Sequence, residues 1–343
     1  MIKENKKFNK KIWIILIIGI IIIVSIFFFK RTEDSKPDLI IGYSPGSFGH
    51  SPIIIGKELG LFEKQGLKVE YIPFSSTKYA RQAIAAKQVN IVTGGANNYI
   101  EPMSKDIKIK FIAPMVTAPT YIFVRPNEIT KLVELNNSLV ASRIDATSGY
   151  ALKRILREDN ISINFNFEDI ESTYAPIALM DKKMVIAVAK GGEGKEEFLK
   201  TGAVVLKEWE EKGYLNRYFL GTSIIIDDSF LENNPEVVDK FIDGYIESQK
   251  FIVENPNETY KILAEFMNKD SEGVIIYINE TVKNSLSALK FTLWTDPNEF
   301  LDFAKYAKEY GIIDKNLSLE DIYNNRFEEK LKKAQIEIYG IKN

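Results

Sequence analysis

The fold class of this chain can be inferred from residues 39–74, LIIGYSPGSFGHSPIIIGKELGLFEKQGLKVEYIPF. It begins with the apolar run LIIGY (39–43), which predicts a buried strand, and continues through a turn rich in Pro, Gly and Ser. A helix is expected from about Pro52 to Gly60, and LKVEYIPF (67–74) predicts a second strand. A strand, a helix and a strand in this order predict a parallel βαβ unit.

The alternation of strands and helices continues beyond this unit and then starts again. The first series is expected to contain helices over 78–87 and 97–104 and strands over 90–95 and 107–115. PTYIFVR (119–125) is extended and carries the chain out of this series. The second series is expected to contain strands over 138–142, 165–170, 184–189 and 203–207 and helices over 147–158 and 175–182. Regular alternation predicts mostly parallel sheets with helices on both faces.

After the second series, TSIIID (222–227) predicts a strand that returns to the first series, and several helices close the chain. A second α/β unit inserted into the first implies two lobes. We therefore predict an α/β protein in which residues 38–118 and 221–343 form lobe 1 and residues 119–220 form an inserted lobe 2.

The N-terminal segment IWIILIIGIIIIVSIFFF (12–29) has eighteen residues without a charge. At about 1.5 Å of rise per residue, a helix of this length spans about 27 Å, which is enough for a bilayer core. Residues 1–11 carry five Lys, which predicts a cytoplasmic N-terminus and a globular part outside the cell membrane. The apolar run ends in three Phe, followed by Lys30 and Arg31. A cleavage site needs small residues there, so an uncleaved anchor with a polar linker (30–37) is favoured over a signal peptide.

Charge and composition exclude several classes of function. The formal net charge is -2, but residues 1–37 hold eight Lys and Arg against three acids, so residues 38–343 carry about -7. An acidic globular part argues against a nucleic-acid partner. The chain has no Cys, which excludes disulfides, thiolate metal sites and a lipidated cysteine, and His50 is its single histidine. We expect neither a metal nor a cofactor.

Several segments match known motifs. They are IGYSPGSFGHSPIIIGKELGLFEKQGLKVEYIPF (41–74), AIAAKQVNIVTGG (83–95) and ITKLVELNNSLVAS (129–142). These segments resemble the nitrate-, aliphatic-sulfonate- and taurine-binding family of ABC importers, which includes thiamine-precursor-binding relatives. Two Asn-Pro helix starts about twenty residues apart, in ENNPEVV and VENPNET, are also similar to the family. The resemblance covers roughly residues 38–270. It implies the type II periplasmic-binding-protein fold with a ligand between the lobes.

The resemblance also implies partners. A monomeric ectodomain would bind a small molecule and then contact an ABC permease and its ATPase subunit. One stretch departs from the family, because AKGGEGKEE (189–197) stands where many members have a Trp-Glu-Pro-like step.

Candidate ligand-binding residues are predicted from the fold. In open α/β sheets, ligands bind beyond the carboxyl ends of the strands, where helix N-termini present unpaired N–H groups. In lobe 1 these positions are Ser44, Pro45, Gly46, Ser47, His50, Gly94, Gly95, Ala96, Asn97 and Thr117. Ordinary turns and N-caps are the alternative interpretation of these residues. His50 has no recognisable Ser or Asp partner, so no catalytic role is assigned to it.

In lobe 2 the candidate residues are Arg143, Thr147, Ser148, Gly149, Tyr174, Lys190 and Glu193. A helix N-terminus with hydroxyls and a nearby guanidinium forms a good anion cradle, and the alternative is an N-cap with Arg143 paired to Asp145. Tyr174 is expected either to stack on a planar ligand or to pack. Lys190 and Glu193 are expected either to line the site or to be solvated.

The sequence favours a transport receptor for an anionic, sulfonate or aromatic-type solute. Solute binding would close the two lobes about the crossings near residues 118 and 221. A tethered sensor ectodomain and an enzyme on the same fold are the alternatives. Thiamine-pyrimidine synthesis goes with a cysteine-rich motif, which this chain lacks. Menaquinone synthesis is a cytoplasmic role, which disagrees with the anchor.

Overall fold

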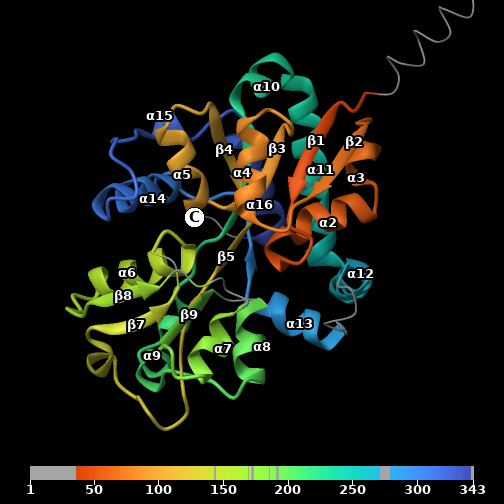
Figure 1. The fold of residues 1–343 in the computed structure, drawn as a ribbon. Helices are drawn as coiled ribbons and strands as arrows, with labels where there is room; N and C mark the ends of the chain where they lie inside the picture. Colours follow the sequence, from red (N-terminus) through yellow and green to blue (C-terminus); the bar gives the residue numbers. More distant parts are fainter. Residues whose placement is uncertain are drawn as a thin grey trace, which may run out of the picture. The chain divides into compact units, whose positions relative to one another are not determined.

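Among the residues that the structure describes, two five-stranded sheets and one three-stranded sheet carry the fold (Figure 1). The computed structural model describes residues 36–142, 144–168, 170, 174–184, 186–190, 193–270 and 279–340. The chain divides into the units Met1–Asp38 and Leu39–Asn343, and every element named below belongs to the second. The anchor predicted at residues 12–29 lies outside the described residues. Within the described residues, no helix is long and apolar enough to span a bilayer.

The first sheet has the strand order β2-β1-β3-β12-β4. Its strands are β1 (Leu39–Tyr43), β2 (Val69–Pro73), β3 (Ile91–Gly95), β4 (Ile109–Pro114) and β12 (Thr222–Asp227). β1 pairs in parallel with β2 and β3, whereas β12 lies antiparallel between β3 and β4. The strand predicted at residues 222–227 therefore does join the sheet formed by the first part of the chain.

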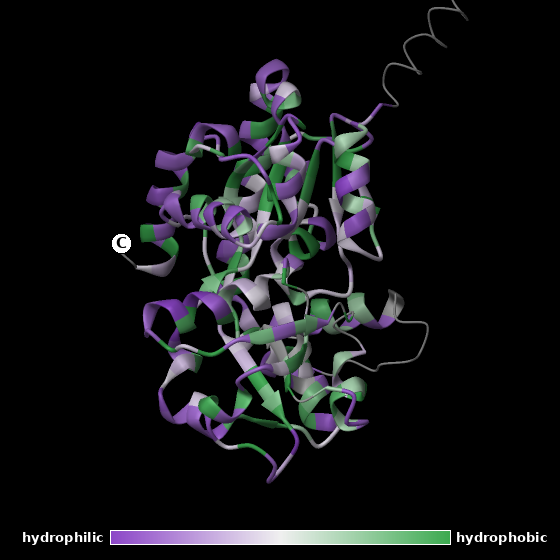
Figure 2. Cartoon of the chain, turned by 60° about the vertical axis from the view of Figure 1, so that its left-hand side comes forward, coloured by the Kyte–Doolittle hydropathy of each residue, from purple (hydrophilic) through white to green (hydrophobic). Residues whose placement is uncertain are grey.

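Helices cover both faces of the first sheet because successive residues of its strands point to opposite sides. Ile224 and Ile226 of β12 belong to one apolar core, and Ile225 belongs to the other. The helices on the first face include α2 (Ser51–Glu58), α3 (Leu61–Lys64) and α11 (Pro235–Glu254). The helices on the second face include α4 (Thr77–Ala85), α5 (Asn97–Ser104) and α14 (Asn298–Glu309). Figure 2 shows apolar residues concentrated in the strands and polar residues on the surrounding helices.

The second sheet has the strand order β10-β6-β9-β7-β8. Its strands are β6 (Thr120–Val124), β7 (Ser138–Ala141), β8 (Phe165–Glu168), β9 (Ile186–Lys190) and β10 (Val204–Val205). β7 pairs in parallel with β8 and β9, whereas β6 is antiparallel to β9 and β10. Its helices are α6 (Thr147–Glu158), α7 (Ala175–Met180), α8 (Glu193–Lys200) and α9 (Lys207–Glu211).

A third, small sheet is formed where the chain passes between the two larger sheets. Its strands are β5 (Val116–Ala118), β11 (Phe219–Leu220) and β13 (Lys290–Phe291), with β5 in the centre and antiparallel to both neighbours. β5 connects β4 to β6, and β11 leads back to β12. The sequence predicted these two crossings but gave no sign of β13, which is only two residues long.

The remaining elements are short helices and the C-terminal helices. They are η1 (Phe48–His50), η2 (Leu132–Leu135), η3 (Tyr214–Asn216), α10 (Asp228–Asn233), α12 (Pro256–Asp270), α13 (Asn279–Ser287), α15 (Leu319–Ile322) and α16 (Glu328–Tyr339). α11 and α12 begin at the prolines of the two Asn-Pro steps, as expected for proline in the first helical turn.

A buried polar network attaches β13 to the helices behind it. The hydroxyl of Tyr245 donates to the carbonyl oxygen of Pro114 at 2.6 Å. Gln249 Nε2 donates to the carbonyl oxygen of Thr292 at 3.1 Å, and Gln335 Oε1 accepts a hydrogen bond from Thr292 Oγ1 at 3.3 Å. α11 and α16 therefore hold the segment that follows β13 against the end of β4.

Candidate functional site

The loop after β1 is fixed to β3 by His50. His50 is 5% exposed, its Nδ1 lies 2.5 Å from Thr93 Oγ1, and the N–H group of Ser44 donates to the same nitrogen at 3.5 Å. Nδ1 is therefore an acceptor, which assigns the ring proton to Nε2. Burial lowers the pKa of His50 to about 4, so the imidazole is neutral at physiological pH.

Asn97, the first residue of α5, joins the two large sheets. Its Nδ2 donates to the carbonyl oxygen of Asp145, and its Oδ1 accepts a hydrogen bond from Thr147 Oγ1. The orientation of the amide follows from these two partners. Because α5 follows β3 and α6 follows β7, the residues beyond one strand of each sheet are in direct contact.

Gly95 makes this contact possible. A Cβ atom at Gly95 would lie 3.0 Å from Thr147 Oγ1, 2.9 Å from Asn98 Nδ2 and 3.1 Å from Asn97 Oδ1. A side chain at this position would displace the side chains of Asn97, Asn98 and Thr147 and so disturb the contact between α5 and α6. At Gly94, a Cβ atom would lie 2.9 Å from the ring of Tyr99, which is fully buried. Close packing against neighbouring side chains therefore favours glycine at both positions.

The first turn of α6 has no side-chain cap, because its N-cap residue is Ala146. The hydroxyl of Thr147 is bonded to Asn97, and the hydroxyls of Ser148 and Ser142 lie 3.0 Å apart. The hydroxyls that the sequence predicted for a ligand are therefore engaged with protein partners. The backbone N–H groups of a first helical turn carry the partial positive charge that attracts anions.

The other predicted residues have varied environments. Ser44, Pro45 and Ser47 are half-buried and Gly46 is exposed in the loop after β1, whereas Ala96 and Gly149 are buried. Thr117 is half-buried in β5, where it pairs with Leu220 and Lys290. Tyr174 is 65% exposed at the start of α7. Arg143 and the side chains of Lys190 and Glu193 lie outside the described part of the chain.

Three buried hydroxyls near these strand ends were missed by the sequence prediction. Tyr99 OH, Thr120 Oγ1 and Ser223 Oγ have no hydrogen-bond partner among the described residues. Ser223 pairs in register with Gly94, which also adjoins Tyr99. The sequence does mark such hydroxyls, because a polar residue within an apolar strand, such as the Ser in TSIIID, stands out from its neighbours. Within the described residues, no group of His, Asp and Glu has the arrangement of a metal site.

Comparisons with known proteins identify the family and the fold of the chain. The sequence profile of the family described as "NMT1/THI5 like" matches residues 47–259. No curated protein matches the sequence.

Several solved structures are similar to this chain. The ligand-binding component of an ABC-type import system from Staphylococcus aureus is 13% identical, with a TM-score of 0.68 over 85% of this chain and 98% of that one. The periplasmic aliphatic sulphonate binding protein SsuA from Escherichia coli is 16% identical, with a TM-score of 0.68 over 84% and 97%. The periplasmic nitrate-binding protein NrtA from Synechocystis is 13% identical, with a TM-score of 0.63 over 88% and 90%. These likenesses show that the chain has the periplasmic-binding-protein fold.

Proposed function

Because this chain belongs to the NMT1/THI5-like family, we propose that it is the extracytoplasmic solute-binding subunit of an ABC importer. It captures a small solute between two lobes and delivers it to a permease and its ATPase subunit. The lobes are residues 38–118 with 221–343, and residues 119–220. The proposal is supported by solved structures of the same fold that are described as an ABC import component, a sulphonate-binding protein and a nitrate-binding protein.

The observation that carries the proposal is the contact of Asn97 with Asp145 and Thr147. This contact joins the residues that follow β3 in the first sheet to the residues that follow β7 in the second sheet. Ligands of open α/β sheets bind at this end of the strands, so one solute there would touch both sheets. A solute held by both lobes couples its binding to their movement, which is what a transport receptor requires.

The chemistry of the described site favours binding over catalysis. His50 is neutral, and its Nδ1 is occupied by Thr93 and by the N–H group of Ser44, so it is poorly suited to accept a proton from a substrate. The other described candidates are hydroxyls, an amide and backbone groups, which bind a solute through hydrogen bonds. We therefore infer that the protein is not an enzyme.

The proposed solute is anionic, sulfonate-like or aromatic with an acidic head group. Its head group would bind the first turn of α6, at Thr147, Ser148 and Gly149, together with the guanidinium of Arg143. Tyr174, Lys190 and Glu193 would surround the remainder of the solute. The first turn of α6 supports this assignment because no side chain caps it.

Mass spectrometry of small molecules released from the purified full chain tests the function directly. We expect a bound solute of low molecular weight, and calorimetry with nitrate, taurine and methanesulfonate would then define its class. Loss of one charge-assisted hydrogen bond of about 1.5–3 kcal/mol predicts that Arg143→Ala weakens binding of that solute by roughly 10- to 150-fold. Arg157→Ala, an exposed change on α6, is the matched control. A bound cation, or equal affinities for both variants, would refute the anion site.

The anchor at residues 12–29 is proposed to hold the protein to the outer face of the cell membrane. Protease added to intact cells should then digest the globular part, while the chain should fractionate with membranes. Recovery of a soluble protein that begins near Lys30 would show instead that the segment is cleaved.

A further inference from the structure

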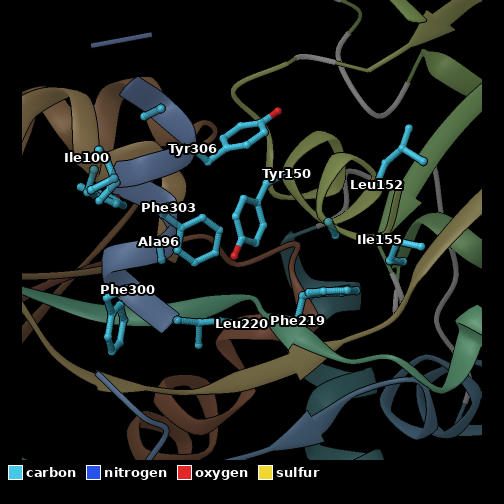
Figure 3. Packing of buried hydrophobic residues seen from close by; sticks show 14 of the residues in the cluster. Ala96, Ile100, Tyr150, Leu152, Ile155, Phe219, Leu220, Phe300, Phe303 and Tyr306 are labelled. Carbon is cyan, nitrogen blue, oxygen red and sulfur yellow. The ribbon is translucent and has the colours of Figure 1, made fainter. Parts of the chain in front are cut away.

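α6 of the second sheet packs against α14, which belongs to the C-terminal part of the chain (Figure 3). The ring centroids of Tyr150 and Phe303 are 4.2 Å apart, and Tyr306 meets Tyr150 edge-on at 5.2 Å. One apolar core contains Ile225 of the first sheet and Val140 of the second, together with Ile100 of α5 and Leu152 of α6. The two sheets are therefore joined by packed side chains as well as by the strands of the third sheet.

Arg154 lies at the centre of this contact. Its guanidinium donates to both carboxylate oxygens of Glu299 on α14, at 2.7 and 3.2 Å. It also donates to Glu158 at 2.8 Å and to the Tyr150 hydroxyl at 3.0 Å, and it lies 5.5 Å from the ring centroid of Phe219 in β11. The side chain is 17% exposed. One cation thus links α6, α14 and the strand by which the chain returns to the first sheet.

The same contact reaches the loop that precedes α6. Tyr306 of α14 donates its hydroxyl hydrogen to the carbonyl oxygen of Ile144 at 2.9 Å. The next carbonyl oxygen, that of Asp145, accepts from Asn97, and Thr147 donates to the same amide. α5 and α14 therefore hold residues 144–147 between them, although these residues follow a strand of the second sheet.

We propose that Arg154 is a positioning residue for the solute site and that the lobes pivot on the contact between α6 and α14. The ion pair with Glu299 keeps α6 in place, so that Tyr306 and Asn97 can hold residues 144–147 in one conformation. A bidentate pair of low exposure resists separation, whereas the strands of the third sheet are only two or three residues long. The consequence for solute binding rests on the proposed function, but the pivot itself does not.

The experiment measures the distance between the lobes in the full chain without added solute. The protein has no native cysteine, so Tyr79→Cys on α4 and Ile177→Cys on α7 introduce two exposed labelling sites, one on each side. Spin labels there report the distribution of distances between the two sheets. We expect Arg154→Met to add a longer and broader component. Amide exchange at Tyr150, whose N–H group donates to the carbonyl oxygen of Ala146 at 3.0 Å, should become about tenfold faster or more.

Two further variants test the same ion pair. Glu299→Gln removes the bidentate carboxylate on α14 and leaves Arg154 with Glu158 and with Asp302 of α14, which lies 3.8 Å from its Nη1. This variant serves if Arg154→Met does not fold. Arg154→Lys keeps the charge but not the bidentate geometry, and it should restore the distances only in part.

The matched control is Arg157→Met, on the same helix one turn later. Arg157 also reaches α14, at Glu309, but both side chains are about half exposed, at 52% and 50%. Unchanged distances and exchange rates in Arg154→Met and Glu299→Gln, or an equal change in Arg157→Met, would overturn the proposal. If the distances change as expected but mass spectrometry finds no bound solute, the pivot stands and the proposed transport function fails.

Discussion

Replacing Asn97 with Ala removes the two hydrogen bonds by which α5 holds the first turn of α6. These bonds join its Nδ2 to the carbonyl oxygen of Asp145 and its Oδ1 to the hydroxyl of Thr147. A hydrogen bond within a protein contributes about 0.5–1.5 kcal/mol net, so the pair is worth about 1–3 kcal/mol. Asn97 is half-buried, which favours the middle of this range. We expect Asn97→Ala to lower the free energy of unfolding by about 2 kcal/mol.

Urea unfolding of the full chain, followed by tryptophan fluorescence, measures this loss. Trp209 is fully buried beside Tyr214, so its emission should report unfolding of the second sheet. Asn98→Ala is the matched control, because only the backbone carbonyl oxygen of Asn98 accepts a described hydrogen bond, from Arg81. If the two variants agree to within about 0.5 kcal/mol, the Asn97 contacts carry no stability and the reasoning is wrong.

Three other changes have defined outcomes. Gly95→Ala should destabilise the protein by about 1–3 kcal/mol in urea unfolding, whereas Gly46→Ala, with no atom within 4 Å of its new Cβ, should have little effect. The folded-state pKa of His50 lies near 4, below the ordinary value of 6.5, so the unfolded chain binds this proton first as pH falls. Stability should therefore drop between pH 6.5 and 4 by about 3 kcal/mol more in the native protein than in His50→Gln, and parallel pH profiles would contradict this. Gln249→Leu leaves buried partners near β13 unsatisfied and should cost about 1–3 kcal/mol, while the exposed change Gln82→Leu should cost less than about 0.5 kcal/mol.

The local elements were largely predictable from the sequence. The helix predicted over residues 147–158 is α6 with the same bounds, and the helix predicted over 97–104 is α5. The apolar run at 222–227 is β12 of the first sheet. Such elements are encoded by the periodicity of nearby residues, because burial of one face or of both faces leaves a pattern of fixed spacing. The alternation of strands and helices therefore predicted the α/β class.

The contacts that shape the candidate site were not predictable in this way. Asn97 and Thr147 are fifty residues apart, and their hydrogen bond depends on how the two sheets face each other. The pairing of His50 with Thr93 depends on the position of the loop after β1 relative to β3. The packing of α14 on α6 likewise leaves no local signal, because an apolar helix face does not specify which element covers it.

The way residues 144–147 are held also bears on the kind of solute that fits. The carbonyl oxygens of Ile144 and Asp145 accept hydrogen bonds from Tyr306 and Asn97, so both acceptors already have protein donors. The first turn of α6 that follows has no side-chain cap, and its N–H groups are donors. A solute that approaches the backbone of this edge therefore meets N–H donors more readily than carbonyl acceptors. At the proposed solute site, this asymmetry would favour a solute rich in acceptor oxygens, such as a carboxylate or a sulfonate, over a cationic amine.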